Sequence, residues 1–286
     1  MGKTLYVSDL DGTLLQPDAT LSARTVEMLD EAIRRGALFT VSTARTPATV
    51  APIMKDVDLR LPASVMTGTA LWDKRENRYL SVNYMDEKGV RELVDIYRRM
   101  DYPTFLYTLH DDMIHIYHLG PLSDNEREFI EQRTGNPYKR FHIPADGDSE
   151  LPGYLGDTVL FYGIQPDILS TPTFELTSKV ENVRAQKYYD FYGPEIGILE
   201  AFSPRSTKAE GLAMLKRLTG AERTVAFGDN LNDIPMLRSA DVGVAMENAL
   251  DEVKAAADIV IGPNTADSVA RFILDDLDSK ESTDPS

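Results

Sequence analysis

Two carboxylates stand two residues apart at the point where an apolar run near the start of the chain ends. Asp9 and Asp11 follow Leu5 to Ser8, and Gly12 allows the chain to turn tightly straight after them. Paired carboxylates at such a position can hold a hard cation or exchange protons with a substrate. A loop rich in Asp and Gly accounts for the same motif without any chemistry, so the motif alone leaves both interpretations open.

A second group of acids follows another apolar run much later in the chain. Asp229 comes directly after Ala226 to Gly228, and Asn232 and Asp233 stand at the start of the next helix. Helix capping could account for Asp233, but not for Asp229, which lies too close to the strand end. If both runs belong to one sheet, their ends together offer the oxygen-rich site that Mg²⁺ requires. The metal would neutralise a pocket that is otherwise acidic.

Two further positions could supply groups that complement an anion. Thr43 and Arg45 close the run that begins at Ala37, and their hydroxyl and guanidinium groups suit phosphate oxygens. An ordinary N-cap before the next helix explains Thr43 equally well on spacing alone. Lys208 begins a helical stretch, where the helix dipole disfavours a cation, so a bound anion would explain its placement. An exposed, solvated lysine is the alternative for Lys208 by itself.

Short apolar runs and helical periods alternate at both ends of the sequence. This order predicts the α/β class, with a Rossmann-like doubly wound parallel sheet whose ligand crevice lies at the carboxyl ends of the strands. The middle, from about 84 to 192, has aromatic runs of period two, which predict an inserted α+β domain. All four histidines fall there, and the spacing of His115 and His118 favours exposed histidines over a metal site. The runs expected to be strands buried on both faces are Leu5 to Ser8, Ala37 to Thr43, Ala63 to Thr67, Thr224 to Gly228, Val242 to Met246 and Ile259 to Ile261.

The composition narrows the classes of function. The chain has 286 residues, and 30 Lys and Arg against 46 Asp and Glu give a formal net charge of −16. This excess disfavours nucleic acid and anionic membranes as partners. Cysteine is absent, which excludes disulfides, Cys-ligated metals and thiol nucleophiles and fits a reducing compartment, with the cytoplasm as the default. We find no signal-peptide core and no run long enough to span a membrane, and we expect 278–286 to be a disordered acidic tail.

Taken together, these groups resemble a known family. The four motifs of haloacid dehalogenase-like (HAD) phosphatases, above all of the Cof-type sugar-phosphatase branch, are matched in order and position by Asp9 to Thr13, Thr43, Lys208 and Gly228 to Asp233, with Asn248 and Ala249 following. The middle resembles the α/β (C2-type) cap of that branch by size and insertion point. The resemblance therefore implies a HAD-like catalytic core of 1–82 and 194–286 and an inserted α/β cap domain of 83–193.

The resemblance also implies a mechanism. Asp9 would be the nucleophile that forms an aspartyl-phosphate, and Asp11 would protonate the leaving oxygen and later activate water. Mg²⁺ would sit between Asp9, the backbone carbonyl of Asp11 and Asp229, with Asp233 orienting its shell. The phosphoryl oxygens would be held by Thr43, Lys208 and Asn232.

Several positions depart from the common pattern of that family. Ala44 and Glu247 stand where Gly is usual, Ser268 where Gly often follows Asp, and Thr67 where Asn is common. None of these changes removes a catalytic group, so the resemblance implies a Mg²⁺-dependent phosphatase acting on a small phosphorylated metabolite such as a sugar phosphate. A phosphomutase or other phosphotransferase of the same superfamily and a non-catalytic binding or regulatory protein are the alternatives. No motif names the substrate, the cap residues that select it or the oligomeric state.

Overall fold

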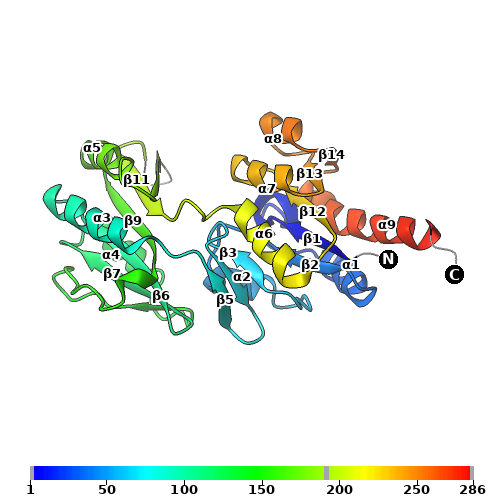
Figure 1. Ribbon diagram of the computed structural model, residues 1–286, viewed down its shortest axis with the longest axis horizontal. Helices are drawn as coiled ribbons and strands as arrows, with labels where there is room; N and C mark the ends of the chain where they lie inside the picture. The colour runs from blue at the N-terminus through cyan, green and yellow to red at the C-terminus, as the bar shows by residue number, and fades with distance from the viewer. Residues whose placement is uncertain (1–2, 190–192, 284–286) are drawn as a thin grey trace. The chain divides into compact units, whose positions relative to one another are not determined.

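The computed structural model describes residues 3–189 and 193–283, and the chain divides into two compact units (Figure 1). The first unit joins Met1–Val82 to Arg205–Ser286, and the second unit is the intervening Asn83–Pro204. The second junction corrects the expectation, which placed 194–204 in the first unit. It falls later because β11 (Ile196–Phe202) pairs on both sides with strands of the second unit.

A parallel sheet forms the centre of the first unit. Its strands are β1 (Thr4–Ser8), β2 (Leu38–Val41), β12 (Arg223–Gly228), β13 (Val242–Met246) and β14 (Ile259–Ile261), in the order β14-β13-β12-β1-β2. Ser8 of β1 is level with Phe227 of β12 and with Val41 of β2, and all the strands run the same way. The residues that follow these strands therefore meet at one edge. This arrangement confirms the predicted α/β class with a parallel sheet core.

Helices connect these strands. They are α1 (Ala23–Arg34), α2 (Pro47–Ile53), α6 (Lys208–Thr219), α7 (Ile234–Ser239), α8 (Asp251–Ala256) and α9 (Ser268–Thr283). The hydroxyl of Thr207 accepts a hydrogen bond from the backbone N–H of Glu210 (3.1 Å), and this cap makes Lys208 the first residue of α6. Gly220, with φ of +62°, ends the same helix. In the described part of the chain, no helix is both long and apolar enough to cross a membrane.

Two predicted strands differ from the expectation. The run from Ala63 shortens to β3 (Ala63–Val65), which starts an antiparallel sheet with β4 (Ala70–Asp73) and β5 (Arg78–Val82). A parallel bridge between Ser42 and Ser64 links its start to the end of β2. β14 is not buried on both faces: Ile259 and Val260 are 40% and 50% exposed, because β14 is the edge strand of its sheet.

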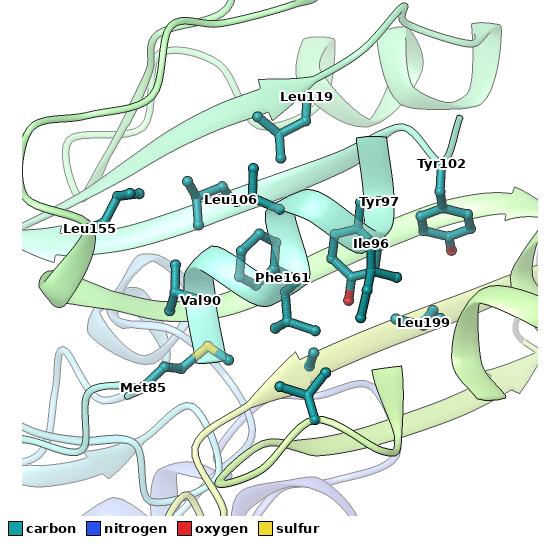
Figure 2. Close-up of a cluster of buried hydrophobic side chains, with 14 of the residues drawn as sticks. Met85, Val90, Ile96, Tyr97, Tyr102, Leu106, Leu119, Leu155, Phe161 and Leu199 are labelled. Atoms are coloured by element: carbon teal, nitrogen blue, oxygen red, sulfur yellow. The ribbon is translucent and has the colours of Figure 1, made fainter. Parts of the chain in front are cut away.

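The second unit is built on a sheet of order β10-β11-β9-β6-β7-β8, antiparallel except for the pair β7 and β8. Its further elements are α3 (Glu87–Arg99), β6 (Thr104–His110), β7 (Met113–Leu119), α4 (Asp124–Glu131), β8 (Lys139–Phe141), β9 (Thr158–Pro166), α5 (Asp167–Thr177) and β10 (Arg184–Tyr189). Tyr97 of α3 packs with Leu106 and Phe161 on one face of this sheet, as Figure 2 shows. The unit is the α+β insertion that the sequence predicts, but its aromatic strands β6 and β7 are buried on both faces instead of alternating between buried and exposed residues.

The sequence predicts exposed histidines in this unit, but the structure shows otherwise. His118 is fully buried, and its Nε2 lies 3.0 Å from Oε1 of Glu126 in α4. His115 is also buried, and its Nδ1 lies 2.8 Å from Nε2 of His142. The expectation failed because both faces of this strand are covered, so each buried ring needs a polar partner from a neighbouring segment.

The end of the chain is more ordered than the sequence suggests. The expected tail begins at 278, but α9 continues to Thr283, while 284–286 lie outside the described residues. The carboxylate of Asp276 accepts hydrogen bonds from Tyr6 (2.5 Å), Arg223 (2.7 Å) and Lys280 (2.7 Å). The contacts with Tyr6 and Arg223 fasten α9 to the sheet, and the pairing of Arg35 with Asp278 (2.7 Å) fastens it to the end of α1, which composition alone did not reveal.

Candidate active site

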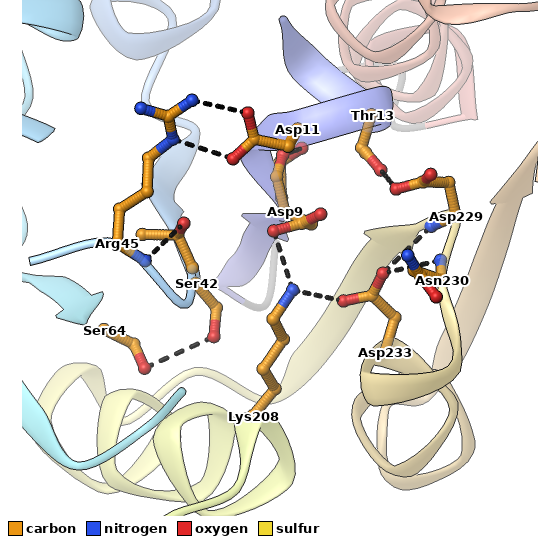
Figure 3. Close-up of polar contacts among 12 residues, drawn as sticks. Asp9, Asp11, Thr13, Ser42, Arg45, Ser64, Lys208, Asp229, Asn230 and Asp233 are labelled. Atoms are coloured by element: carbon orange, nitrogen blue, oxygen red, sulfur yellow. Dashed lines mark hydrogen bonds and ion pairs between the residues drawn. The ribbon is translucent and has the colours of Figure 1, made fainter. Parts of the chain in front are cut away.

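A cluster of charged side chains lies where β1 and β12 end beside the start of α6 (Figure 3). Asp9 directly follows β1, and its backbone N–H donates to the carbonyl of Phe227 in β12 (3.0 Å). Asp9 is 6% exposed and Lys208 is 1% exposed. The parallel register of the two strands therefore brings residues from both ends of the chain into one buried site.

Lys208 is a buried ammonium shared by two carboxylates. Its Nζ lies 2.7 Å from Oδ1 of Asp9 and 2.5 Å from Oδ1 of Asp233. Burial acts to lower the pKa of Lys208, but the two carboxylates outweigh it and raise that pKa. Lys208 is thus held as a cation inside the site, and the alternative of a solvated surface lysine is wrong.

The pKa of Asp9 results from opposing effects of burial and of two neighbouring charges. Burial raises the pKa of Asp9 to about 7, the charge of Lys208 acts to lower it, and the charge of Asp233 acts to raise it again. A second cation close to Asp9 would return this carboxyl to its charged form. The charge of Asp9 therefore depends on which ions bind beside it.

Asp233 organises the loop that follows β12. Its Oδ2 accepts hydrogen bonds from the backbone N–H groups of Asp229 and Asn230, both at 3.0 Å, while its Oδ1 holds Lys208. A Cβ atom at Gly228 would stand 2.4 Å from the Cβ of Asp233, so only glycine permits this close approach. Because both oxygens of Asp233 are engaged, this residue positions the loop and Lys208.

Three carboxylates of the cluster could surround a cation. One oxygen from each of Asp9, Asp229 and Asp233 lies within 4.8 Å of the other two. Oδ1 of Asp229 accepts a hydrogen bond from Thr13 (2.8 Å), and in the described residues no hydrogen bond reaches its Oδ2. Burial raises the pKa of Asp229, which a divalent cation would oppose. An all-oxygen set in which Oδ2 of Asp229 accepts no hydrogen bond from the described residues fits Mg²⁺, with Asp233 in support.

The loop carrying Asp11 is held close to this set from two sides. Gly12 has φ of +72°, and a Cβ there would stand 2.3 Å from Oδ2 of Asp229. The side chain of Asn248 donates to the carbonyl of Gly12 (2.7 Å) and accepts from the backbone N–H of Asn264 (3.0 Å). The motifs alone assign no role to Asn248, although the residue stands in the segment that the family resemblance includes.

Asp11 lies at the open side of the cluster and is paired with a guanidinium. Its side chain is 54% exposed, and Arg45 donates from Nε to Oδ2 (2.7 Å) and from Nη2 to Oδ1 (2.6 Å). This pairing with Arg45 lowers the pKa of Asp11. Arg45, which the sequence suggested for phosphate oxygens, is therefore engaged with a carboxylate.

Thr43 is connected to the same pair. It is buried, and its hydroxyl accepts the backbone N–H of Arg45 (3.1 Å). The residue at the N-cap of α2 is Thr46, so the alternative that Thr43 is an ordinary helix cap is wrong. Asn232 is exposed in the turn before α7, and no hydrogen bond among the described residues links it to the cluster.

The backbone beside Thr43 is strained. Met66, Thr67 and Gly68 have φ values of 51°, 54° and 77°, and the N–H of Thr67 donates to the carbonyl of Thr43 (2.9 Å). A Cβ at Gly68 would stand 1.9 Å from the carbonyl oxygen of Thr207 at the start of α6. At Met66 and Thr67, which are not glycines, such conformations cost about 1–3 kcal/mol each and persist where surrounding contacts hold them. This loop is therefore fixed between Thr43 and the helix that carries Lys208.

The positions that depart from the family pattern have different surroundings. Ala44 and Glu247 are exposed. Ser268 is buried at the start of α9, where its hydroxyl donates to the carbonyl of Pro263 (2.8 Å). These residues leave the contacts of Asp9 and Lys208 intact.

Known proteins share this sequence pattern. A family model described as haloacid dehalogenase-like hydrolase matches residues 6–273. Pyridoxal phosphate phosphatase YbhA of Escherichia coli (strain K12) is 29% identical over 278 residues, which cover 94% of this chain and 97% of that protein. The 5-amino-6-(5-phospho-D-ribitylamino)uracil phosphatase YitU of Bacillus subtilis (strain 168) is 27% identical over 274 residues, which cover 94% of this chain and 96% of that protein.

A solved structure shares the fold. The crystal structure of a haloacid dehalogenase-like hydrolase from Bacteroides thetaiotaomicron superposes with a TM-score of 0.71 at 22% identity, covering 95% of this chain and 98% of that one. The family model spans nearly the whole chain and includes every residue of the charged cluster. The chain therefore belongs to the haloacid dehalogenase-like hydrolase family, and it is a phosphatase of that family.

Proposed function

We propose that the chain is a Mg²⁺-dependent phosphatase that hydrolyses a small phosphorylated metabolite, such as a sugar phosphate, through an aspartyl-phosphate on Asp9. The contact between Asp9 and Lys208 (2.7 Å) carries this proposal. A buried carboxylate fixed by a buried ammonium has a defined direction of attack, and the ammonium reduces repulsion between two anions. The two curated relatives are named for phosphate esters of small molecules, which supports this substrate class.

In the first step, an oxygen of Asp9 forms a bond to phosphorus, and the bond from phosphorus to the ester oxygen breaks. Asp11 gives its proton to the departing oxygen. In the second step, Asp11 takes a proton from water, whose oxygen attacks the aspartyl-phosphate, so inorganic phosphate leaves and Asp9 is restored. Asp11 must separate from Arg45 for these transfers, because the bidentate pair holds both of its oxygens.

The phosphoryl oxygens need donors that lie close to Asp9. Lys208 supplies an ammonium at 2.7 Å from Asp9, and Thr43 supplies a buried hydroxyl at the end of the neighbouring strand. We assign Asn232 as a third donor on its position in the exposed turn before α7. These groups would bind the phosphoryl group and stabilise the charge that spreads over its oxygens.

Asp9, the backbone carbonyl of Asp11 and Asp229 would hold the Mg²⁺, with Asp233 orienting the loop that carries Asp229. The ion supplies charge neutralisation for two carboxylates and a phosphate. The chain contributes the rest: Lys208 and Asp233 orient the set, and Gly12 allows the loop of Asp11 to approach Asp229. We assign catalysis to the first unit and the selection of substrate, as an α/β cap, to the second.

The decisive test measures inorganic phosphate released from a panel of phosphorylated metabolites, with and without Mg²⁺. We expect release that disappears on chelation and returns on readdition of Mg²⁺. Asp229→Asn should raise the Mg²⁺ concentration needed for half-maximal activity and weaken Mg²⁺ binding measured directly by calorimetry. Asp241→Asn, an exposed acid that pairs with Lys216 on the surface, is the matched control and should change neither.

A mass measurement tests the covalent step. Acid quenching during turnover should trap a phosphate on the parent protein and none on Asp9→Asn. Activity that survives exhaustive chelation, or a covalent phosphate that remains in Asp9→Asn, would contradict the proposal. Transfer of the phosphoryl group to a sugar hydroxyl with no inorganic phosphate would point to a phosphomutase.

A further inference from the structure

Thr67 has a backbone conformation that is costly for its type of side chain. It is the second of three consecutive residues with positive φ, at 54°, in the turn between β3 and β4. Glycine and asparagine enter this left-handed region readily, whereas a β-branched residue does so only under strain. Glycine at this position would donate the same backbone hydrogen bond. The side chain of Thr67 therefore costs the fold free energy without serving the turn.

The turn adjoins two of the groups that we assign to the phosphoryl oxygens. The N–H of Thr67 donates to the carbonyl of Thr43 (2.9 Å). On the other side, a Cβ at Gly68 would stand 1.9 Å from the carbonyl oxygen of Thr207, the residue before Lys208. All of these residues belong to the first unit. Thr67 therefore lies between the end of β2 and the start of α6, beside both donors.

The hydroxyl of Thr67 has no partner among the described residues. Its side chain is half-buried, and within 3–189 and 193–283 no hydrogen bond reaches the hydroxyl. Thr69 differs, because it is 4% exposed and its hydroxyl donates to the carbonyl of Met66 (2.6 Å), which closes the turn. Water can also satisfy a half-buried hydroxyl, but water gives no reason for a threonine in this strained conformation. The strain and the position of Thr67 together indicate contact with a ligand.

The position of Thr67 limits which part of the substrate it can contact. A threonine hydroxyl lies one bond beyond Cβ, so its partner must lie close to the turn and therefore close to the phosphoryl group. The proposed function already assigns the phosphoryl oxygens to Lys208, Thr43 and Asn232. A further hydroxyl beside this set is left for the first carbons of the alcohol part of the ester.

We propose that the hydroxyl of Thr67 forms a hydrogen bond with a hydroxyl group on the alcohol part of the substrate, next to the ester that is cleaved. The proposal rests on the proposed phosphatase function and narrows its substrate class to phosphate esters of polyols and sugars. Hydroxyl groups both donate and accept, so the two can pair in either direction. Esters of simple alcohols lack this partner.

Two esters with the same carbon chain test this contact. The full chain with Asp9→Asn and Mg²⁺ is titrated by calorimetry with glycerol 3-phosphate and with propyl phosphate, which lacks the two hydroxyl groups of the former. We expect glycerol 3-phosphate to bind about three- to tenfold more tightly, the effect of one neutral hydrogen bond. The kcat/KM values of the parent protein for the two esters should differ by the same ratio.

Variants of Thr67 locate the effect. Thr67→Val keeps the shape and the strain but removes the hydroxyl, so the preference should disappear, whereas Thr67→Ser should keep most of it. Thr67→Gly should also lose the preference, but its urea midpoint should be unchanged or higher, because relief of strain offsets the greater chain entropy of glycine. Thr69→Val is the matched control from the same turn. It should lower the urea midpoint and leave the preference intact.

The proposal is overturned if the two esters bind equally or if the preference survives Thr67→Val. An equal loss of affinity for both esters in Thr67→Val would assign the hydroxyl to the phosphoryl group, which also overturns it. A lower urea midpoint in Thr67→Gly would show that the side chain serves the fold. Failure of the proposed function looks different, because the parent protein then releases no phosphate from either ester, while the preference in binding and its loss in Thr67→Val remain.

Discussion

Buried charge is treated in opposite ways by the two units. In the first, Lys208 is 1% exposed and contacts Asp9 and Asp233, so the chain itself supplies the cation that these two carboxylates share. In the second, Lys139 of β8 is half-buried, and within 3–189 and 193–283 it forms no ion pair, while burial lowers its pKa to about 8. Charges matched within the chain fix a geometry before any ligand arrives, whereas an unmatched charge leaves part of its interaction energy for the ligand. The first arrangement suits catalysis, because reacting groups must be aligned before the substrate binds.

Removing the matched cation should have the largest effect. Lys208→Met leaves Asp9 and Asp233 buried without a counter-charge, and loss of one partner from a buried pair costs about 3–5 kcal/mol. Phosphate release should fall by at least about 10²- to 10³-fold, as expected for a lost charge-stabilising donor. Urea unfolding and a phosphate assay measure the two losses.

Lys216→Met is the control on the same helix. Lys216 is an exposed residue of α6 that pairs with Asp241 at 3.1 Å, so its loss should change stability by about 1 kcal/mol or less. If Lys208→Met were as stable and as active as Lys216→Met, the distinction between matched buried charge and ordinary surface charge would fail.

Asp11 is an exposed carboxylate whose charge is matched by Arg45. Asp11→Asn should lower the rate by about 10²- to 10⁴-fold, the contribution of a positioned acid–base, with little change in stability. The loss should be larger for glycerol phosphate, whose alkoxide leaves poorly, than for p-nitrophenyl phosphate. Hydrolysis of the covalent intermediate should slow with both esters. Rates with the two esters decide the role, since equal losses with an unchanged dephosphorylation step would exclude Asp11 as the acid–base.

The pKa of Asp9 makes stability depend on pH. Because the pKa rises from 3.8 to about 7 on folding, the protonated form is favoured in the folded chain. This contribution is complete below pH 3.8 and is lost as the pH rises through 7, so without divalent cations stability should decline across that window. Asp9→Asn should flatten the decline, as measured by urea midpoints in chelator. A parent protein and variant with parallel profiles would show that Asp9 does not carry this linkage.

The smallest effect is expected for Asn248, an uncharged side chain that forms hydrogen bonds to Gly12 and Asn264. Asn248→Ala removes the hydrogen bonds to Gly12 and Asn264, which should cost about 1 kcal/mol. Because the loop of Gly12 approaches Asp229, the variant should also need more Mg²⁺ for half-maximal activity. Glu247→Ala, an exposed neighbour, is the control for both measurements. Identical behaviour of the two variants would make Asn248 an ordinary surface residue.

The charged cluster could be predicted from sequence because two of its carboxylates directly follow predicted strands. Asp9 and Asp229 each follow a buried run, and parallel strands bring such residues to one edge whatever lies between them. Lys208 could be placed at a helix start by the helical stretch that follows it, and its conflict with the helix dipole pointed to an anion. In each case, the pattern of neighbouring residues in the sequence was enough to predict the position of the side chain.

The remaining features depend on contacts between distant segments. Asn248 acts through a loop near the start of the chain, and Arg45 pairs with Asp11 instead of waiting for an anion. The order of α9 comes from Asp276, whose partners belong to strands far away in sequence. Lys139 gives no local signal at all, since its unpaired state depends on which side chains surround one face of a sheet.

The position of β1 between β2 and β12 has a consequence for the order of folding. β2 follows β1 closely in the chain, but β12 is synthesised only after all strands of the second unit. The second unit comes from one continuous segment, so it can complete its sheet before β12 has been synthesised. Asp9 therefore spends most of translation as a solvated carboxylate without Lys208 or Asp229 beside it. Assembly of the charged cluster therefore requires the long loop between β1 and β12 to close, which is a slow step in folding.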